Sequence, residues 1–360
     1  MTGEKKDPLQ DPRFRAPSIW QTLREGLFGS RRMLECIQVE VTSFCPGRCT
    51  YCPHTTQESI WNSRHMAPET FARLWSLMRL SERIHLQGWG EPFLHPRFMD
   101  FVRLARKAEC SVSTTSCGLR MDERLAESIV ASGLDIVAFS LVGTDEESNA
   151  PRAGVPFSRV SESIRLLQAV RKKRMGVHLE IHLAYLMLAS RMEAVLRLPD
   201  LMDTLDIHAT VVSTLDYIAA PGMETEAFLP HETDKRKKAQ SLLEQAAGQA
   251  AQRGRSLYFT LPSPLPASKA VPCRENATKT LYVDAEGNMA PCIYLNLPVT
   301  PEDPLAQENV NRRVFGSIME QDPLSVWNSA PFKAFREALN TPIPDFPCRT
   351  CPKRFENDID

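Results

Sequence analysis

Short β-type runs alternate with helical segments over the first two thirds of this chain. The runs span residues 37–44, 84–87, 111–115, 135–141, 177–184 and 207–213. Helical segments of about 10 to 17 residues separate them, and this alternation is typical of βαβ units in a parallel sheet. Six units suit a partial (β/α)6 TIM-like barrel, whose functional groups lie at the carboxyl ends of its strands. The sequence therefore predicts an α/β fold.

A proline-rich stretch at residues 261–266 follows a charged helical segment at 232–253 and should end regular structure there. Because single hydrophobic cores stop growing at about 250 to 300 residues, a chain of 360 residues is expected to form two unequal domains. We expect an N-terminal extension at 1–35 with a helix at 19–27, and a core barrel at 36–230. A helix and linker at 231–270 and a smaller α+β domain at 271–360 should follow, the latter with a hairpin at 280–292 and a helix at 331–339.

Composition excludes several classes of protein. Hydrophobic residues make up 42% and charged residues 24%, with a net charge of -1, which argues against a disordered chain or a nucleic-acid binder. The polar N-terminus and the lack of any stretch of about 18 apolar residues favour a cytoplasmic protein that does not enter a membrane. In such a chain ten cysteines are poor candidates for a disulfide framework, so clustered ones are interpreted as metal ligands.

Three cysteines lie within eight residues directly after the first predicted strand: Cys45, Cys49 and Cys52. Iron–sulfur clusters usually take four thiolates, so three leave one iron open to a substrate or cofactor. Zinc sites prefer repeated C-x2-C pairs, which makes zinc a poorer interpretation here, and inert thiols are the other alternative.

This motif resembles the C-x3-C-x-Φ-C signature of the radical S-adenosylmethionine (SAM) superfamily, with Tyr51 as its aromatic residue. The resemblance continues through a Gly-Trp-Gly-Glu-Pro stretch similar to the family's GGEP motif, in which Trp89 departs from the pattern, and through Thr114 to Gly118, similar to its S-T-N-G stretch. It implies a site-differentiated [4Fe-4S] cluster and bound SAM. The implied SAM contacts are Tyr51, Gly88, Gly90, Glu91, Pro92, Ser116, Ser140 and Arg152.

A second cysteine set lies beyond the proline-rich stretch: Cys273, Cys292, Cys348 and Cys351. With Gly287 it resembles the C-x9-15-G-x4-C pattern of the SPASM domain, which carries auxiliary iron–sulfur clusters. The further cysteines of the fullest SPASM domains are missing here, so the resemblance implies one second [4Fe-4S] cluster with full ligation. A structural zinc site with four cysteine ligands is the alternative.

Three other side chains are candidates for catalysis. Glu180 and His182 alternate along the fifth predicted strand and can share one face, with a core or solvent-facing position as the alternative. Cys117 replaces the Asn of the family's S-T-N-G stretch, and a buried inert thiol is the alternative for it. Cys36 and Cys110 are interpreted as small apolar fillers.

The resemblance implies an enzyme that cleaves SAM reductively to a 5′-deoxyadenosyl radical, which then abstracts a substrate hydrogen. Because about 35 residues precede the first strand, too few for an added peptide-binding domain, we expect cofactor biosynthesis or small-molecule modification. A peptide- or protein-modifying maturase is the alternative within the enzyme class. A non-catalytic iron–sulfur redox sensor or scaffold is the alternative outside it. A flavodoxin- or ferredoxin-like protein is the expected electron donor.

Overall fold

The structure is a computed structural model that describes residues 7–16, 32–229, 231–262, 273–299, 312–341, 348–351 and 353. The helix predicted at 19–27 lies outside these residues. So do all of the predicted extension except 7–16 and 32–35, and residues 263–266 of the proline-rich stretch.

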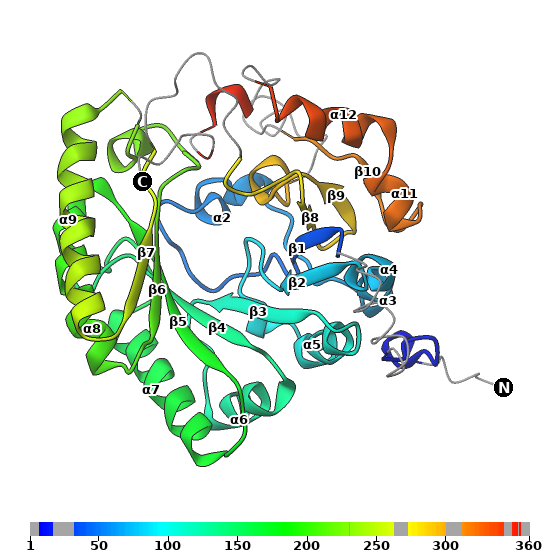
Figure 1. The fold of residues 1–360 in the computed structure, drawn as a ribbon, viewed down its shortest axis with the longest axis horizontal. Coiled ribbons are helices and arrows are strands. Elements are labelled where there is room, and N and C mark those ends of the chain that lie inside the picture. The colour runs from blue at the N-terminus through cyan, green and yellow to red at the C-terminus, as the bar shows by residue number, and fades with distance from the viewer. Residues whose placement is uncertain are drawn as a thin grey trace.

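Six parallel strands form the centre of the sheet, each overlapping a run that the sequence predicts, with β1 and β2 beginning three residues earlier than predicted. They are β1 (Leu34–Val39), β2 (Ser81–His85), β3 (Ser111–Ser116), β4 (Ile136–Leu141), β5 (Glu180–Met187) and β6 (Ala209–Thr214). Neighbours in sequence are neighbours in the sheet, and every pair from β1 to β6 is parallel. The predicted α/β fold with a partial barrel is therefore confirmed (Figure 1).

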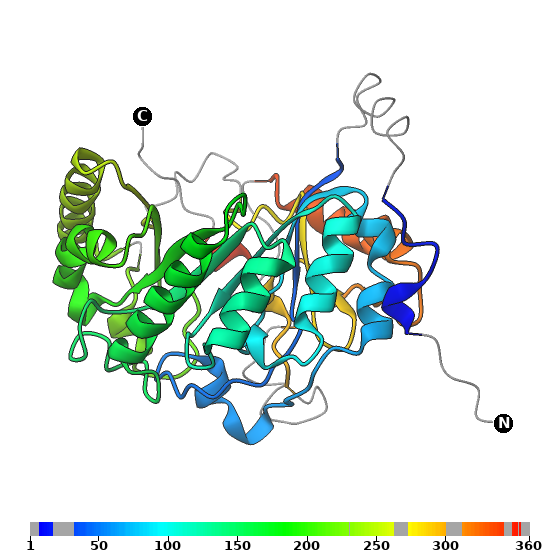
Figure 2. The same cartoon turned by 90° about the horizontal axis from the view of Figure 1, so that it is seen from below.

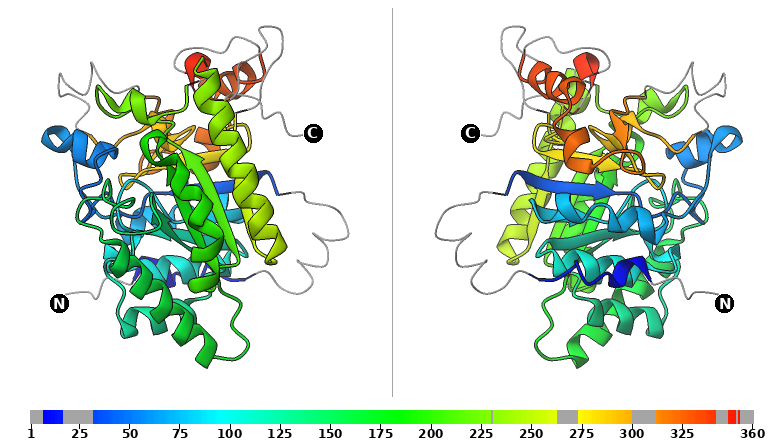
Figure 3. Two further views of the ribbon diagram at one scale, coloured as in Figure 1. Left: turned by 90° about the vertical axis from the view of Figure 1, so that its left-hand side faces the viewer. Right: turned by 90° about the vertical axis from the view of Figure 1, so that its right-hand side faces the viewer.

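Helices cover the outer face of the curved sheet (Figures 1 and 3). They are α5 (Phe98–Lys107), α6 (Glu123–Ser132), α7 (Phe157–Lys173), α8 (Leu198–Thr204) and α9 (Thr233–Gln252). Residues alternate between buried and half-buried along β3, β4 and β5, because only one face of each strand packs against these helices. Helix α6 is capped at its start by Asp122, whose carboxylate accepts from Leu125 N at 2.7 Å, and at its end by the left-handed Gly133.

Four further strands extend the sheet beyond the six central ones. Strand β7 (Ser256–Phe259) pairs parallel with β6, in a segment predicted from the sequence to be a linker. Strand β8 (Thr280–Val283) pairs parallel with β1 and forms the predicted hairpin with β9 (Asn288–Ala290). Strand β10 (Gly316–Ser317) pairs antiparallel with β9, so the described residues form one sheet of ten strands.

The C-terminal region thus shares a sheet with the barrel, and Figure 2 shows it beside β1. The division at residues 230 and 270 stays a prediction. The other α-helices of the described residues are short: α2 (Pro53–Thr56), α3 (Pro68–Ala72), α4 (Trp75–Met78), α11 (Pro323–Trp327) and α12 (Ala330–Ala338), the last at the predicted position. Turns of 3-10 helix are η1 (Pro8–Gln10), η2 (Glu58–Ile60), η3 (Pro92–Leu94), η4 (Ala189–Arg197), η5 (Met223–Glu226), η6 (Ile293–Leu295) and η7 (Cys348–Thr350).

The inner face of the sheet is partly open. Val211 on β6 and Tyr258 on β7 pair in register and remain 49% and 60% exposed, whereas their neighbours Val212 and Leu257 are buried against the helices. Within the described segments, no helix is both long and apolar enough to cross a membrane.

Candidate radical SAM site and auxiliary cysteine site

The loop after β1 carries the first three cysteines. Cys52 precedes α2, where Pro53 occupies the first helical position, and the Cys52 backbone N–H donates to Cys49 O at 3.1 Å. Gly47 lies between the other two thiols, because a Cβ placed there would stand 3.6 Å from Cys45 Sγ and 3.7 Å from Cys49 Sγ. Both sulfur atoms therefore flank one small space that a glycine leaves free.

Burial lowers the acidity of two of these thiols. It raises the pKa of Cys45 to about 11 and that of Cys52 to about 12. The metal-free thiols of Cys45 and Cys52 are thus protonated at neutral pH, and binding iron must release their protons. No three His, Cys, Asp or Glu side chains in the described ranges converge tightly enough to hold a metal ion. The fit to a cluster rests on the donor chemistry and on the shared space between the sulfurs.

A second loop, after β4, is hydrogen-bonded to the cysteine loop. Arg48 N donates to Ala153 O at 2.8 Å, and Thr50 N donates to Pro151 O at 2.9 Å. Between these contacts lies Arg152, which is 7% exposed and donates from Nη1 to the Tyr51 hydroxyl at 3.3 Å. Its Nε has no partner among the described residues. A buried guanidinium with a free N–H next to the thiols is suited to bind an anionic ligand group.

The order of the Arg152 loop depends on Asn149, which sequence reasoning missed. Asn149 is 2% exposed, accepts from Val142 N at 3.1 Å and donates from Nδ2 to Val155 O at 3.1 Å. One side chain thereby closes both ends of the loop. An Asn a few residues before an expected ligand contact carries no pattern that would have revealed this role.

The turn after β2 packs directly on the chain that follows β1. A Cβ on Gly90 would overlap the backbone carbonyl of Thr42, and Glu91 N donates to Phe44 O at 2.8 Å. The indole of Trp89 lies 5.8 Å from the ring of Tyr217 and 6.1 Å from that of Tyr294. The departure from the GGEP pattern therefore has a structural reason, since Trp89 joins this turn to the loop after β6 and to η6.

Glu91 is held by β3 and its following loop. It is 2% exposed and accepts from Ser116 Oγ at 2.8 Å and from Cys117 N at 2.6 Å. It also caps η3 by accepting from Phe93 N at 3.3 Å, while Pro92 starts that turn. The Ser116 hydroxyl therefore helps to orient the Glu91 carboxylate, and a direct contact of Ser116 with SAM remains a prediction.

Cys117 is 8% exposed, and burial together with the neighbouring Glu91 raises its pKa, so it is a neutral thiol. Ser140 lies next to the carboxyl end of β4 and pairs in register with Ala184 of β5. Both positions belong to the end of the sheet where the cysteine loop leaves β1. The structure thus brings Cys117 to the predicted end of the barrel.

Glu180 and His182 share one face of β5, and Glu180 Oε2 lies 2.7 Å from His182 Nε2. Glu180 and His182 are the first and third residues of β5, and Ala184, which pairs with Ser140 of β4, is the fifth. At a rise of about 3.3 Å per residue, His182 lies roughly 7 Å from Ala184 along β5, toward the amino end of the strand. The pair stands at the amino end of β5, so a catalytic role for either residue remains a prediction.

The second cysteine set is carried by three segments of the chain. Besides burial, charges on Cys273 and Cys348 act to raise the pKa of the Cys351 thiol, and charges on Cys273 and Cys351 act to raise that of Cys292, so these thiols are near neighbours. Cys292 precedes η6, and Cys351 N donates to Cys348 O at 3.4 Å at the end of η7. Burial raises the pKa of Cys351 to about 12. The four side chains are the donor set that a fully ligated cluster needs.

Lys353 ties this site to the barrel. Its Nζ lies 2.8 Å from Asp216, in the loop after β6, and 3.2 Å from Glu275. The ammonium stands 5.7 Å from the ring of Tyr294, and its backbone carbonyl accepts from Arg274 N at 2.9 Å. The last cysteine pair is thereby anchored to both the barrel and the segment of Cys273.

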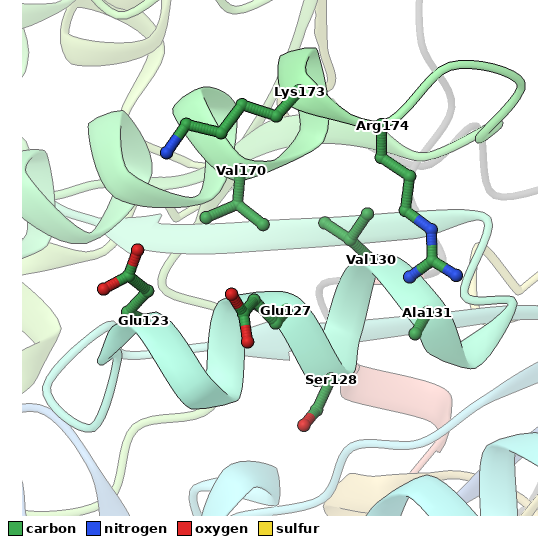
Figure 4. Close-up of a pocket in the computed structure, with 8 residues that line it drawn as sticks. All are labelled: Glu123, Glu127, Ser128, Val130, Ala131, Val170, Lys173 and Arg174. Atoms are coloured by element: carbon green, nitrogen blue, oxygen red, sulfur yellow. The ribbon is translucent and has the colours of Figure 1, made fainter.

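A groove of about 550 Å³ opens elsewhere, between α6 and α7 (Figure 4). Glu123 and Glu127 line one side of it, and Lys173 and Arg174 line the other. It lies between two helices of the outer face, whereas the cysteine loop follows the carboxyl end of β1. The groove is therefore not part of the candidate site.

Two family models match the chain. The model of the radical SAM superfamily matches residues 39–188, and that of the SPASM iron–sulfur cluster-binding domain matches residues 273–352. A tungsten-containing aldehyde ferredoxin oxidoreductase cofactor-modifying protein of Pyrococcus furiosus is 23% identical over 84% of this chain and 83% of its own length. A PqqA peptide cyclase of Granulibacter bethesdensis is 21% identical over 88% of this chain and 79% of its own.

Solved structures support the fold. Streptococcus suis SuiB bound to S-adenosylmethionine superposes with a TM-score of 0.62 at 14% identity, over 94% of this chain and 81% of that one. Native anSMEcpe with bound AdoMet gives a TM-score of 0.63 at 14% identity, over 88% of each chain. The two matched family models, which contain both cysteine sets, show that the chain is an enzyme of the radical SAM superfamily with a C-terminal SPASM iron–sulfur domain.

Proposed function

We propose that this enzyme binds a [4Fe-4S] cluster on Cys45, Cys49 and Cys52, binds SAM beside it, and removes a hydrogen atom from a substrate carbon. The observation that carries the proposal is the joining of three loops. The cysteine loop is hydrogen-bonded to the Arg152 loop through Arg48 N and to the turn after β2 through Phe44 O. Residues with the expected ligand chemistry thus meet at one end of the barrel, as active sites of barrel enzymes do.

Each residue would have a separate task in holding SAM. When bound, the cluster supplies the electron that cleaves SAM to a 5′-deoxyadenosyl radical. Arg152 would bind the SAM carboxylate, since its buried Nε has no other partner among the described residues. Glu91, oriented by Ser116, would accept from the SAM amino group, with the backbone of Gly88, Gly90 and Pro92 around it. Ser140 would face the ribose, and Tyr51 would hold Arg152 in place.

The four C-terminal cysteines would bind a second [4Fe-4S] cluster. Four thiolates leave no iron open, so this cluster would relay electrons and would not bind the substrate. A flavodoxin- or ferredoxin-like protein would supply those electrons.

The proposed substrate is a cofactor precursor or another small molecule. The named activity of the Pyrococcus furiosus relative, which modifies a cofactor, supports this class. A peptide is the second candidate, supported by the PqqA peptide cyclase and by the solved complex of SuiB with the precursor peptide SuiA. The site favours neither class by itself.

The test of the radical chemistry is a triple variant in which Cys45, Cys49 and Cys52 become Ala. Anaerobically reconstituted wild type should hold about eight irons per chain and the variant about four, because one of two cubanes is lost. Under dithionite the variant should form no 5′-deoxyadenosine from SAM. Cys110→Ala is the matched control, because that buried thiol donates to Met78 O on the outer side of the sheet. Undiminished SAM cleavage in the triple variant would refute the proposal.

The substrate class needs a separate measurement. Candidate peptides and small molecules carrying deuterium would be incubated with reduced enzyme and SAM, and 5′-deoxyadenosine analysed by mass spectrometry. Deuterium should appear in it only with a molecule from which the radical takes hydrogen. Transfer from a peptide alone would exclude the small-molecule assignment.

A further inference from the structure

Glu40 is a fully buried carboxyl group at the point where β1 ends. Its side chain is 0% exposed, and its Oε1 accepts from Trp89 N at 3.0 Å. Its own backbone N–H donates to Val283 O, at 2.9 Å, where β8 ends. Its Oε2 makes no hydrogen bond of normal geometry with the described residues, although the Tyr282 hydroxyl and the Ala285 N–H lie close enough to lower the pKa of the carboxyl group against the larger effect of burial. A buried carboxyl group with one oxygen in no such hydrogen bond is costly, which requires an explanation.

Two segments distant in sequence enclose this carboxyl group. On one side, a Cβ on Gly88 would overlap the Glu40 side chain, so the turn after β2 lies directly on it. On the other side are the buried hydroxyl of Tyr282 and the buried Asp284. Tyr282 and Asp284 belong to the hairpin whose second strand leads into Cys292.

Hydrogen bonds fix the hairpin side of this contact. Asp284 accepts from Glu286 N at 2.9 Å, from Asn288 N at 2.8 Å and from Asn296 Nδ2 at 2.7 Å. The small cavity beside Glu40 and Asp284 is also lined by Arg64, which pairs with Glu286, and by Arg312, which donates to Asn296 Oδ1 at 3.2 Å. These are the charged groups that face Glu40 from the surrounding segments.

We propose that Glu40 is a positioning residue. It couples the packing of the auxiliary hairpin, residues 280–290, against β1 to SAM binding at the turn of residues 86–92. The inference rests on the proposed binding of SAM at that turn. Trp89 N is the anchor, and the space left by Gly88 lets the carboxyl group reach it. Any shift of the hairpin moves Glu40, because β8 and β1 are paired up to Val283. By thermodynamic linkage, SAM binding must in turn favour the hairpin packed against β1.

The ionisation of Glu40 supports this coupling. Burial raises its pKa to about 7, with Asp284 contributing through charge repulsion. The ionised form strengthens the hydrogen bond from Trp89 N, since charge-assisted bonds are the stronger ones. It also repels Asp284. The two contacts of Glu40 therefore respond in opposite directions when pH crosses the neutral range.

The first measurement is SAM affinity of the anaerobically reconstituted enzyme, by equilibrium dialysis. Glu40→Ala removes the acceptor for Trp89 N and should weaken SAM binding about tenfold, because losing a hydrogen bond to a charged group typically changes an affinity by about that factor. Glu40→Gln keeps an acceptor oxygen, so its affinity should match wild type at pH 6 and lack the pH dependence of wild type up to pH 8. Glu35→Gln is the control, since Glu35 also joins β1 to the C-terminal region, through Asn276 at 2.6 Å.

The second measurement is hydrogen exchange with and without SAM, which a purely structural role would not alter in this way. In wild type, SAM should slow exchange at 86–92 and also at 280–290. In Glu40→Ala it should slow exchange at 86–92 only, with iron content unchanged. Equal SAM affinity and equal protection of the hairpin in wild type and Glu40→Ala would overturn the inference. Failure of wild type to bind SAM would instead overturn the proposed function.

Discussion

Replacing Glu40 by Gln should change how thermal stability depends on pH, in a direction that its environment fixes. The pKa of Glu40 is raised by burial from 4.5 to about 7. A carboxyl group with a raised folded-state pKa contributes stability that is complete below the unfolded value and is lost as pH rises through the folded value. The window is therefore pH 4.5 to 7, and Gln, which does not titrate, has no such loss.

The size of the effect follows from that shift. At about 1.36 kcal/mol per pKa unit, wild type should lose about 2.5 kcal/mol between pH 5 and pH 8 through this group alone. The unfolding entropy of about 2.1 cal/mol/K per residue gives roughly 0.75 kcal/mol/K for 360 residues. The difference in Tm between Glu40→Gln and wild type should thus rise by about 3 °C over this range.

Differential scanning fluorimetry of the reconstituted proteins at pH 5 and pH 8, under anaerobic conditions, measures this difference. Other titrating groups are common to both proteins and largely cancel. Glu35→Gln is the control, because the ion pair with Lys279 at 3.0 Å lowers the pKa of Glu35, and its removal should give no gain at high pH. A Tm difference that stays constant, or falls, between the two pH values would refute the assignment of a raised pKa to Glu40.

Three other variants test the site. Gly90→Ala should abolish SAM binding, because the new Cβ meets the Thr42 carbonyl, a backbone group that cannot move aside; dialysis with labelled SAM checks it, and wild-type affinity would contradict the packing described. Lys353→Met should lower the free energy of unfolding by about 3 to 5 kcal/mol, because Asp216 and Glu275 lose the cation that they share. It should also release iron from the four C-terminal cysteines on buffer exchange, and retention of about eight irons per chain would contradict the anchoring role of Lys353. Cys117→Ala should be nearly silent if the buried thiol only packs, but should give a quenched or oxidised product if the thiol returns a hydrogen atom; mass spectrometry of the product distinguishes the two.

The sequence by itself determined the layout of the barrel. Period-two burial in strands such as β4 and β5 and the caps at Asp122 and Gly133 depend on residues within a few positions of one another. The same holds for the cysteine loop, because three thiols in eight residues need no distant partner to form a recognisable motif. Local signals of this kind can be interpreted without knowing the fold.

Only the tertiary structure decided how the two cysteine sites are connected. The pairing of β8 with β1, the contact of Trp89 with Tyr294 and the ion pair of Lys353 with Asp216 join residues far apart in the chain. The sequence also did not reveal strand β7, because it is only four residues long and lies next to the proline-rich stretch, so that its pairing with β6 identifies it. In the sequence Glu40 is one acidic residue inside the first predicted strand, at 37–44. Its burial follows from two segments, at 88 and 282–284, that close over it only when the sheet is complete.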